Sequence, residues 1–442
     1  MNREHAFWWH FVPHRKLTLL YLSMGLRSFA LSMVALFIPL YLYQEMGYTL
    51  TETLLFYALF ALVFAIFTPI AAKFCARFGI KHSILFSKPF YVVFLGLLYV
   101  LPYISVPLLI LGLLVGIYLA FYWMGMNLLF HKLSHHNHRG EEVGKWQASK
   151  IFATMIGPLL GGVLISYLGF QFVFALASFL FILSALLLFI HKEAHVRYHF
   201  AFTQLTNKDH WKDSLFFISK GAEVVANLVI WPLFIFGILG SYVSLGTVGS
   251  ILAGVTGVLV LFVGKKSDRI GKRRILQGVA FFDSVAWFLR ALVQTVGHVF
   301  GVSIFAAITG GIRLAPLSAL QFDKAQGDIT AYFVTREVYM CLGRILMSLI
   351  VIMLDSLAGG LVFQGFANLA VLLFYRGTRS CFQSLRFVFI IPNGCAIDFV
   401  AILHRVPFAK LFLVIFCGVF AGLSQGILLL TLLDVPLWPA RC

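Results

Sequence analysis

The sequence predicts an all-α integral membrane protein, and its composition and apolar runs are the observations that predict it. Of 442 residues, 61% are hydrophobic and only 12% are charged, whereas soluble domains carry about 25% charged residues. Many apolar runs exceed the ~18 residues that a membrane-spanning helix needs. Transmembrane β-strands would instead show ~10-residue segments of alternating polarity. Because the runs are continuous, helices are expected.

Twelve apolar segments are long enough to be spans. They are residues 17–43, 53–74, 84–101, 108–130, 147–167, 170–190, 214–239, 245–263, 275–295, 299–320, 331–354 and 357–375. We therefore expect an N-terminal six-helix bundle over residues 1–190, a central cytoplasmic loop over 191–213 and a C-terminal six-helix bundle over 214–375. Residues 376–442 form an atypical hydrophobic C-terminal extension, for which one or two further membrane segments are expected.

Basic residues occur in every second loop between these spans. Lys and Arg are present at 73–81, 132–145 and 265–274, and they are absent from 44–52 and 240–244. This alternation follows the positive-inside rule. It predicts a multi-pass protein of the cell (inner) membrane with a cytoplasmic N-terminus, and it accounts for the formal net charge of +17 without nucleic acid as a partner.

Two basic loops repeat one another. Residues 72–82, after the second span, align without a gap with residues 264–274, after the eighth span. Arg77 falls on Arg269, and Gly79 falls on Gly271. Such a repeat indicates the internal duplication of a transporter.

The second copy has the pattern G-x-x-x-D-R-x-G-[RK]-[RK]-[RK], which resembles the cytoplasmic signature loop of the major facilitator superfamily. Its motif residues are Gly264, Asp268, Arg269, Gly271, Lys272 and Arg273. In the first copy Ala72 and Ala76 replace the glycine and the aspartate. The resemblance implies two pseudo-symmetric bundles around a central cavity, with the loop latching one conformational state. The alternative is a plain positive-inside loop.

A small-residue motif lies in the fifth span. It comprises Gly157, Pro158, Gly161 and Gly162, and it resembles the fifth-helix motif of drug–proton antiporters in the same superfamily. The glycine that precedes the motif in that family is replaced by Ala153. Small residues also let helices approach closely, so antiport and simple packing remain equal alternatives.

Ionisable residues within spans are costly and mark candidate sites. By analogy with the family, the first, fourth, seventh and tenth helices line the cavity. The substrate or coupling candidates are Arg27, Tyr122, Trp123, Asn127, Glu223, Asn227, Arg313, Glu337 and Arg344. Asp283 and Arg290 are expected to be more structural, and Lys88 and Lys220 to extend toward the membrane surface. The alternative is a set of interhelical salt bridges, with ordinary packing for the aromatic candidates.

Two of these candidates carry specific expectations. Glu223 is expected to be a proton-coupling carboxylate, because a low-dielectric site raises the affinity of a carboxyl for its proton. Arg27 is expected to hold an anionic group of the substrate. His131 and His135 are one helical turn apart, but a basic loop without a nearby cysteine favours solvated histidines over a metal site.

These patterns predict a secondary active transporter that moves a small solute by alternating access, by symport or antiport, with proton-coupled efflux as one form. The alternative is a membrane protein of the same fold that does not transport, such as a sensor or an assembly factor. No enzyme activity, cofactor or metal is expected. The expected partners are a small-molecule substrate, protons and the lipid bilayer, and the protein is expected to be a monomer.

Overall fold

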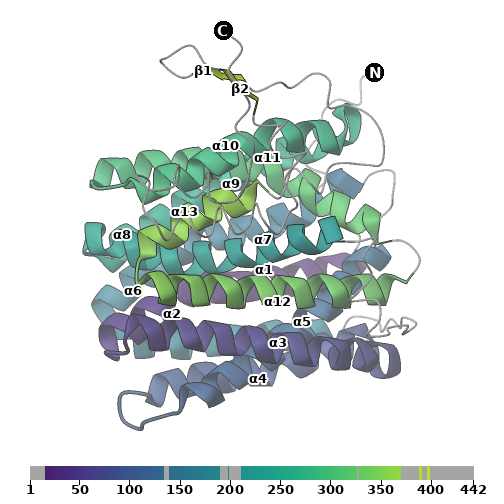
Figure 1. Ribbon diagram of the computed structural model, residues 1–442. Helices are drawn as coiled ribbons and strands as arrows, with labels where there is room; N and C mark the ends of the chain where they lie inside the picture. Colours follow the sequence, from purple (N-terminus) through teal and green to yellow (C-terminus); the bar gives the residue numbers. More distant parts are fainter. Residues whose placement is uncertain are drawn as a thin grey trace, which may run out of the picture. The chain divides into compact units, whose positions relative to one another are not determined.

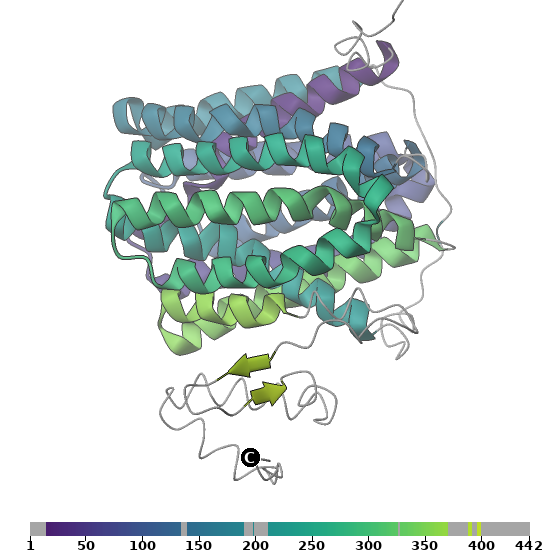
Figure 2. The ribbon, with the colours of Figure 1, turned by 90° about the horizontal axis from the view of Figure 1, so that it is seen from above.

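The computed structural model describes residues 15–133, 139–189, 198, 211–325 and 328–369, together with two short strands. From residue 15 to residue 369 the helices run side by side along a common direction (Figures 1 and 2). This is the arrangement expected where a helix must satisfy its own backbone hydrogen bonds in lipid.

The first half contains long helices joined by short turns. They are α1 (Arg15–Ala35), α2 (Ile38–Leu40), the π-helix η2 (Tyr41–Glu45), α3 (Leu50–Phe78), α4 (Ile80–Val100), α5 (Leu108–Leu133) and α6 (Arg139–Phe189). Helix α6 covers both the fifth and the sixth predicted spans. Its backbone leaves the helical region at Gly169 (φ 81°, ψ 170°), where the sequence predicts the turn between them.

The second half follows the same plan. Its helices are α7 (Trp211–Val225), the π-helix η6 (Ala226–Ile230), α8 (Trp231–Leu239), α9 (Tyr242–Ile270), α10 (Lys272–Ala291), α11 (Val296–Lys324), α12 (Ile329–Leu354) and α13 (Leu357–Asn368). The segment from α7 to α8 is one predicted span with a π-helical turn inside it. Such turns are rare and frequently lie at functional sites.

Nine helical segments within the described residues are long and apolar enough to cross a membrane. One of them, Ala153–Leu188, covers most of the two predicted spans, 147–167 and 170–190, on either side of Gly169. The ninth and twelfth predicted spans correspond to α10, which is rich in charge, and to α13, which has 12 residues. The all-α membrane fold class is therefore confirmed, and twelve spans remain a prediction that agrees with the order of the helices.

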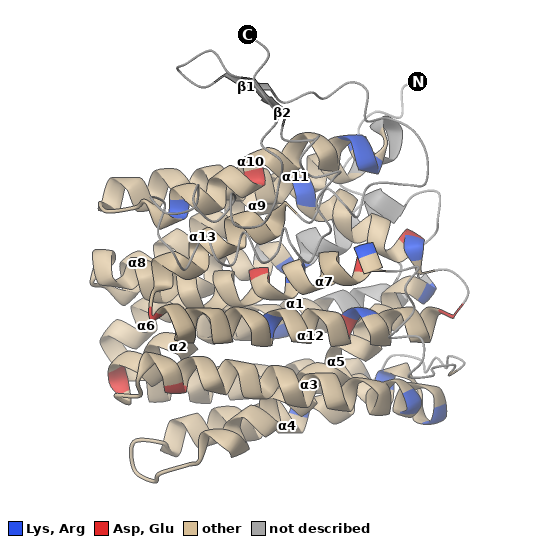
Figure 3. Cartoon of the chain, viewed as in Figure 1, with Lys and Arg blue, Asp and Glu red and all other residues tan. Residues whose placement is uncertain are grey.

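Charges gather at one end of the bundle (Figure 3). Helices α3, α5 and α9 finish there, near Arg77, Lys132 and Lys266, and we call it the basic end. The turns near Tyr103 and Gly240 lie at the other end, called the opposite end. This distribution is the one that the alternation of basic loops predicts.

The repeated loops have matching backbones. Gly79 joins α3 to α4 with φ 103°, and Gly271 joins α9 to α10 with φ 101°. The N–H of each glycine donates to the carbonyl four residues earlier, on Cys75 and Ser267, at 3.1 Å in both cases. L side chains rarely adopt such φ values, so glycine suits both positions. The side chains of Asp268 and Arg269, and with them the predicted latch, lie outside the described residues.

The C-terminal extension forms a unit of its own. Contacts divide the chain into Met1–Tyr375 and Arg376–Cys442. Within the second unit, β1 (Val388–Ile390) pairs antiparallel with β2 (Ala396–Asp398). The further membrane segments predicted for this extension, and most of the predicted loop 191–213, lie outside the described residues.

Candidate functional site

A network of charged side chains lies near the middle of the C-terminal half. Arg313 of α11 donates from Nη2 to Oε1 of Glu223 at 2.5 Å and from Nη1 to Oε2 at 3.1 Å. The same guanidinium places its Nε 2.9 Å from Oδ2 of Asp283, on α10. One arginine therefore serves two carboxylates on two helices.

The same network extends to α7 and α13. The ammonium group of Lys220 donates to Glu223 and, at 3.1 Å, to Oδ1 of Asn368. Asn368 donates in turn to Oδ2 of Asp283 at 2.9 Å. Together with Arg313, these groups carry two positive and two negative formal charges, so the network is neutral overall. Buried charges need partners of this kind.

Arg290 of α10 extends the polar cluster toward the opposite end. Its Nη1 donates to Oδ1 of Asn227 at 2.8 Å. Its guanidinium carbon lies 4.2 Å from the ring centroid of Trp287 and 5.0 Å from that of Trp231. Asn227 lies within the π-helical turn η6, and Trp231 follows that turn directly. The turn and the residue after it therefore supply two of the groups that hold this buried arginine.

The structure thus brings together two sets of residues for which the sequence predicts different roles, one in the site and one in helix packing. Glu223, Asn227 and Arg313 were the better site candidates, and Asp283 and Arg290 the more structural ones. Here Arg313 contacts both Glu223 and Asp283, while Asn227 binds Arg290. All five belong to one cluster.

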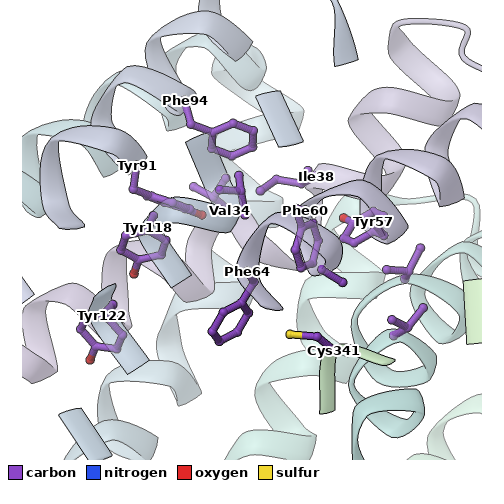
Figure 4. Packing of buried hydrophobic residues seen from close by; sticks show 14 of the residues in the cluster. Val34, Ile38, Tyr57, Phe60, Phe64, Tyr91, Phe94, Tyr118, Tyr122 and Cys341 are labelled. Carbon is purple, nitrogen blue, oxygen red and sulfur yellow. The ribbon is translucent and has the colours of Figure 1, made fainter. Parts of the chain in front are cut away.

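Arg27 occupies the middle of the N-terminal half. It is buried, and its Nε donates to the hydroxyl of Tyr118 at 2.8 Å, with a second bond from Nη2. Its guanidinium carbon lies 3.5 Å from the ring centroid of Tyr122. The rings of Tyr91, Tyr118 and Tyr122 lie one after another (Figure 4). Arg27 is therefore held by neutral groups, in contrast to Arg313.

Lys88 lies in the same half. It is 4% exposed, and its Nζ donates to Oγ of Ser184 at 2.7 Å. Ser184 in turn donates to the carbonyl of Ser23 at 2.9 Å, one helical turn before Arg27. The sequence suggested that Lys88 extends to the membrane surface, but this side chain reaches inward to a hydroxyl on another helix.

The two halves meet at the basic end. Asn127 of α5 donates to Oε1 of Glu337 on α12 at 3.1 Å, and Arg336 donates to the same oxygen at 2.5 Å. Nearby, Nε2 of His131 lies 3.0 Å from the carbonyl oxygen of Ala325. These contacts close the described part of the basic end between α5 and α12.

The two remaining candidates, Trp123 and Arg344, contact different parts of the bundle. Trp123 packs at 5.5 Å from Tyr122, and the ammonium of Lys150 lies 5.8 Å from its ring. Arg344 of α12 lies 4.9 Å from the ring centroid of Phe64, on α3 in the first half. Trp123 therefore lines the N-terminal half, and Arg344 touches both halves.

A second set of contacts joins the halves at the opposite end. The hydroxyl of Tyr242 donates to Oε1 of Glu45 at 2.6 Å, and its ring packs 5.3 Å from that of Phe170. These three residues line a pocket of about 450 Å³. Contacts at both ends indicate a conformation in which neither end is open along these helices.

The small-residue motif of α6 lies where backbones approach most closely. A Cβ added at Gly162 would lie 2.3 Å from the carbonyl oxygen of Tyr242 on α9, and one at Gly161 would lie 2.3 Å from that of Met33 on α1. Gly157 faces Ser32, and Pro158 faces Gly246. The motif therefore packs α6 against helices of both halves, and its link to antiport stays a prediction.

Several residues of these clusters were missed by sequence reasoning. They are Tyr118, Arg336, Asn368 and Tyr242. Lys88 and Lys220 were expected to extend toward the membrane surface, but both bond side chains inside the bundle. Tyr118 precedes Tyr122 by four residues, a helical spacing that puts both rings on one face. Asn368 carries no such signal, because its partners are distant in sequence.

The family model of the Major Facilitator Superfamily matches residues 20–348. The chain belongs to this superfamily. Its membership agrees with the repeated loops and with the two sets of contacts between the halves. The chain is therefore a multi-span membrane protein of a transporter family.

Two curated relatives of the chain are bacterial proteins. Uncharacterized protein YqgE of Bacillus subtilis is 23% identical over 57% of this chain and 62% of its own length. Multidrug resistance protein MdtG of Proteus mirabilis is 27% identical over 41% of this chain and 48% of its own length. The alignments thus span less than two thirds of either relative.

A solved structure shares the fold. The crystal structure of the human organic anion transporter MFSD10 (TETRAN) aligns with a TM-score of 0.61 over 82% of this chain and 99% of that one. The sequence identity is 11%, so this likeness concerns the fold alone.

Proposed function

We propose that this superfamily member is a secondary active transporter, which moves a small solute across the cell membrane by alternating access of its two halves. The basic end and the N-terminus would face the cytoplasm. The observation that carries the proposal is the pair of contact sets between the halves, Asn127–Glu337 at the basic end and Glu45–Tyr242 at the opposite end. Opening one set while keeping the other would expose a central site to one side at a time.

The neutral network in the C-terminal half is the proposed coupling site. Glu223 is bonded by both Lys220 and Arg313, and both of its carboxylate oxygens already accept hydrogen bonds from these cations. Glu223 would therefore take up a proton only after one of these ion pairs opens. Arg313 already contacts Asp283, so it can release Glu223 and keep a carboxylate partner.

Flux in proteoliposomes tests the proposal. The purified protein would be reconstituted and supplied with an imposed pH gradient and a panel of sugars, amino acids, organic acids and cationic dyes. We expect at least one compound to cross faster than in protein-free vesicles, with the gradient setting its direction. A protein of this fold that acts as a sensor or an assembly factor would move none of them.

The substitution Glu223→Gln tests the coupling role. It keeps the shape of the side chain but removes the group that ionises, so we expect gradient-driven flux to fall to the level seen without a gradient. Glu52→Gln is the matched control, because Glu52 caps α3 at the exposed start of the helix. Unchanged pH dependence in Glu223→Gln would rule out this carboxylate as the coupling group.

A further inference from the structure

Within the described residues, buried cationic side chains outnumber buried carboxylates. Within the described residues the buried cations are Arg27, Lys88, Lys220, Arg290, Arg336 and Arg344, whereas the buried carboxylates are Glu223, Asp283 and Glu337. In a low-dielectric interior each unmatched charge is costly. The excess of cations therefore indicates that an anion joins the protein at some stage of its cycle.

Among the described residues, the N-terminal half has no buried carboxylate. Residues 1–190 contain only five acidic residues, namely Glu4, Glu45, Glu52, Glu141 and Glu142. Glu45 bonds Tyr242 at the opposite end, and Glu52 caps α3. In the sequence, Glu141 and Glu142 fall within the basic loop 132–145, and Glu4 precedes the first predicted span. Neither Glu45 nor Glu52, the two acidic residues of this half whose side chains the structure describes, bonds Arg27 or Lys88.

The carboxylates of the C-terminal half are already engaged. Glu223 is bonded by Lys220 and Arg313, and Asp283 is contacted by Arg313. Glu337 is bonded by Arg336. Each buried carboxylate therefore has a cation of its own half, and the positive charges of Arg27 and Lys88 stay unmatched.

Arg27 and Lys88 keep hydrogen-bonding capacity for a ligand. Arg27 directs Nε and Nη2 to the single hydroxyl of Tyr118, so the described residues offer no acceptor to Nη1. Lys88 has three N–H donors, and the described residues accept one of them, through Ser184. Ser184 links the surroundings of the two cations, because it accepts from Lys88 and donates to the carbonyl of Ser23, one helical turn before Arg27. An oxyanion placed between the two cations would balance their charge and accept the remaining N–H groups.

We propose that Arg27 and Lys88 form the binding site for the anionic group of the solute, and that the solute is a small organic anion. The inference rests on the proposed transport function and names its substrate class. The aromatic rings of Tyr91, Tyr118 and Phe181 surround the site, so an apolar body attached to the anionic group would contact rings rather than water. This surrounding favours an organic acid over an inorganic ion.

Calorimetric titration of the purified protein tests the site. The probes are benzoate, 1-naphthoate and naphthalene-1-sulfonate, with 1-naphthamide as the neutral match of 1-naphthoate and with chloride as the inorganic anion. We expect an organic anion to bind more tightly than either 1-naphthamide or chloride. Arg27→Gln should weaken its binding by about 10- to 100-fold, the range for a lost hydrogen bond to a charged group. Arg27→Lys should retain part of the affinity.

A second measurement separates a substrate site from a structural one. Lys88→Met keeps the length of the side chain but removes an unmatched buried charge, so we expect the ligand-free protein to melt at a higher temperature while anion binding weakens. Lys73→Gln, at an exposed position of the basic end, is the control and should leave binding unchanged. A lower melting temperature for Lys88→Met with unaltered binding would overturn the site, and so would equal binding of naphthamide and naphthoate, binding of chloride alone, or no anion binding.

The two proposals can fail separately. Flux of a neutral or cationic solute, without binding of any organic anion, would refute the anion site and leave the transporter intact. Anion binding that depends on Arg27, without flux of any panel compound, would keep the site and refute the transporter.

Discussion

Replacing Arg313 with methionine is expected to destabilise the protein by about 3–5 kcal/mol, the cost of removing one partner from a buried ion pair. Arg313 contacts both Glu223 and Asp283, so its loss leaves two carboxylates with one cation, Lys220. Thermal unfolding in detergent would measure the effect as a lower melting temperature.

Two variants control this prediction. Lys272→Met removes the partner of Asp323 from a more exposed pair at the basic end, where an ion pair contributes about 1 kcal/mol or less. The double variant Arg313→Met with Asp283→Asn removes one charge of each sign and should recover part of the stability. Equal losses for Arg313→Met and Lys272→Met would contradict the central role of Arg313.

Replacing Gly162 with valine is expected to hold the opposite end open and to reduce transport strongly. A Cβ at this position would lie 2.3 Å from the carbonyl oxygen of Tyr242, and backbone cannot move aside as a side chain can. Overpacking of this kind costs about 1–3 kcal/mol, which corresponds to a population change of about 5- to 150-fold for the closed state. Solute flux should fall by a similar factor.

Cysteine labelling would report the conformation directly. Ser166 lines the pocket at the opposite end, so a cysteine placed there should react faster with a charged maleimide in the Gly162→Val protein. Gly254→Ala is the control on the same pair of helices, because its added Cβ would meet only the flexible side chain of Met155, at 3.1 Å. Unchanged labelling and flux in Gly162→Val would show that this contact does not govern closure.

Much of the fold could be predicted from the sequence, because the signals are local. Runs of apolar residues determine where helices cross lipid, and the positions of Lys and Arg determine which loops share a side. Gly79 and Gly271 aligned as repeats, and both adopt a φ near 100°. Even the turn at Gly169 within the long α6 was evident from a break in hydropathy.

The site was less predictable, because its contacts join residues distant in sequence. Depth within a span identified Arg27, Glu223 and Arg313 as candidates. It could not reveal that Arg313 bridges Glu223 and Asp283, since three helices must pack before those atoms meet.

Lys88 illustrates the same limit. A lysine near a helix end can reach the membrane surface, and only the packing of α4 against α6 shows that it donates to Ser184 instead. The balance of charge in each half depends on these partners, which the sequence alone does not reveal.

Electron–electron distance measurements test the central claim, that the two halves open alternately at the two ends. One spin-label pair would replace Lys132 and Asp328 at the basic end, and the other would replace Gln171 and Ser241 at the opposite end. When solute is added or the pH is lowered, we predict that the distance between the labels at one end lengthens. The distance at the other end should shorten or stay unchanged. Simultaneous lengthening of both distances, or no change in either under any condition that supports flux, would contradict alternating access.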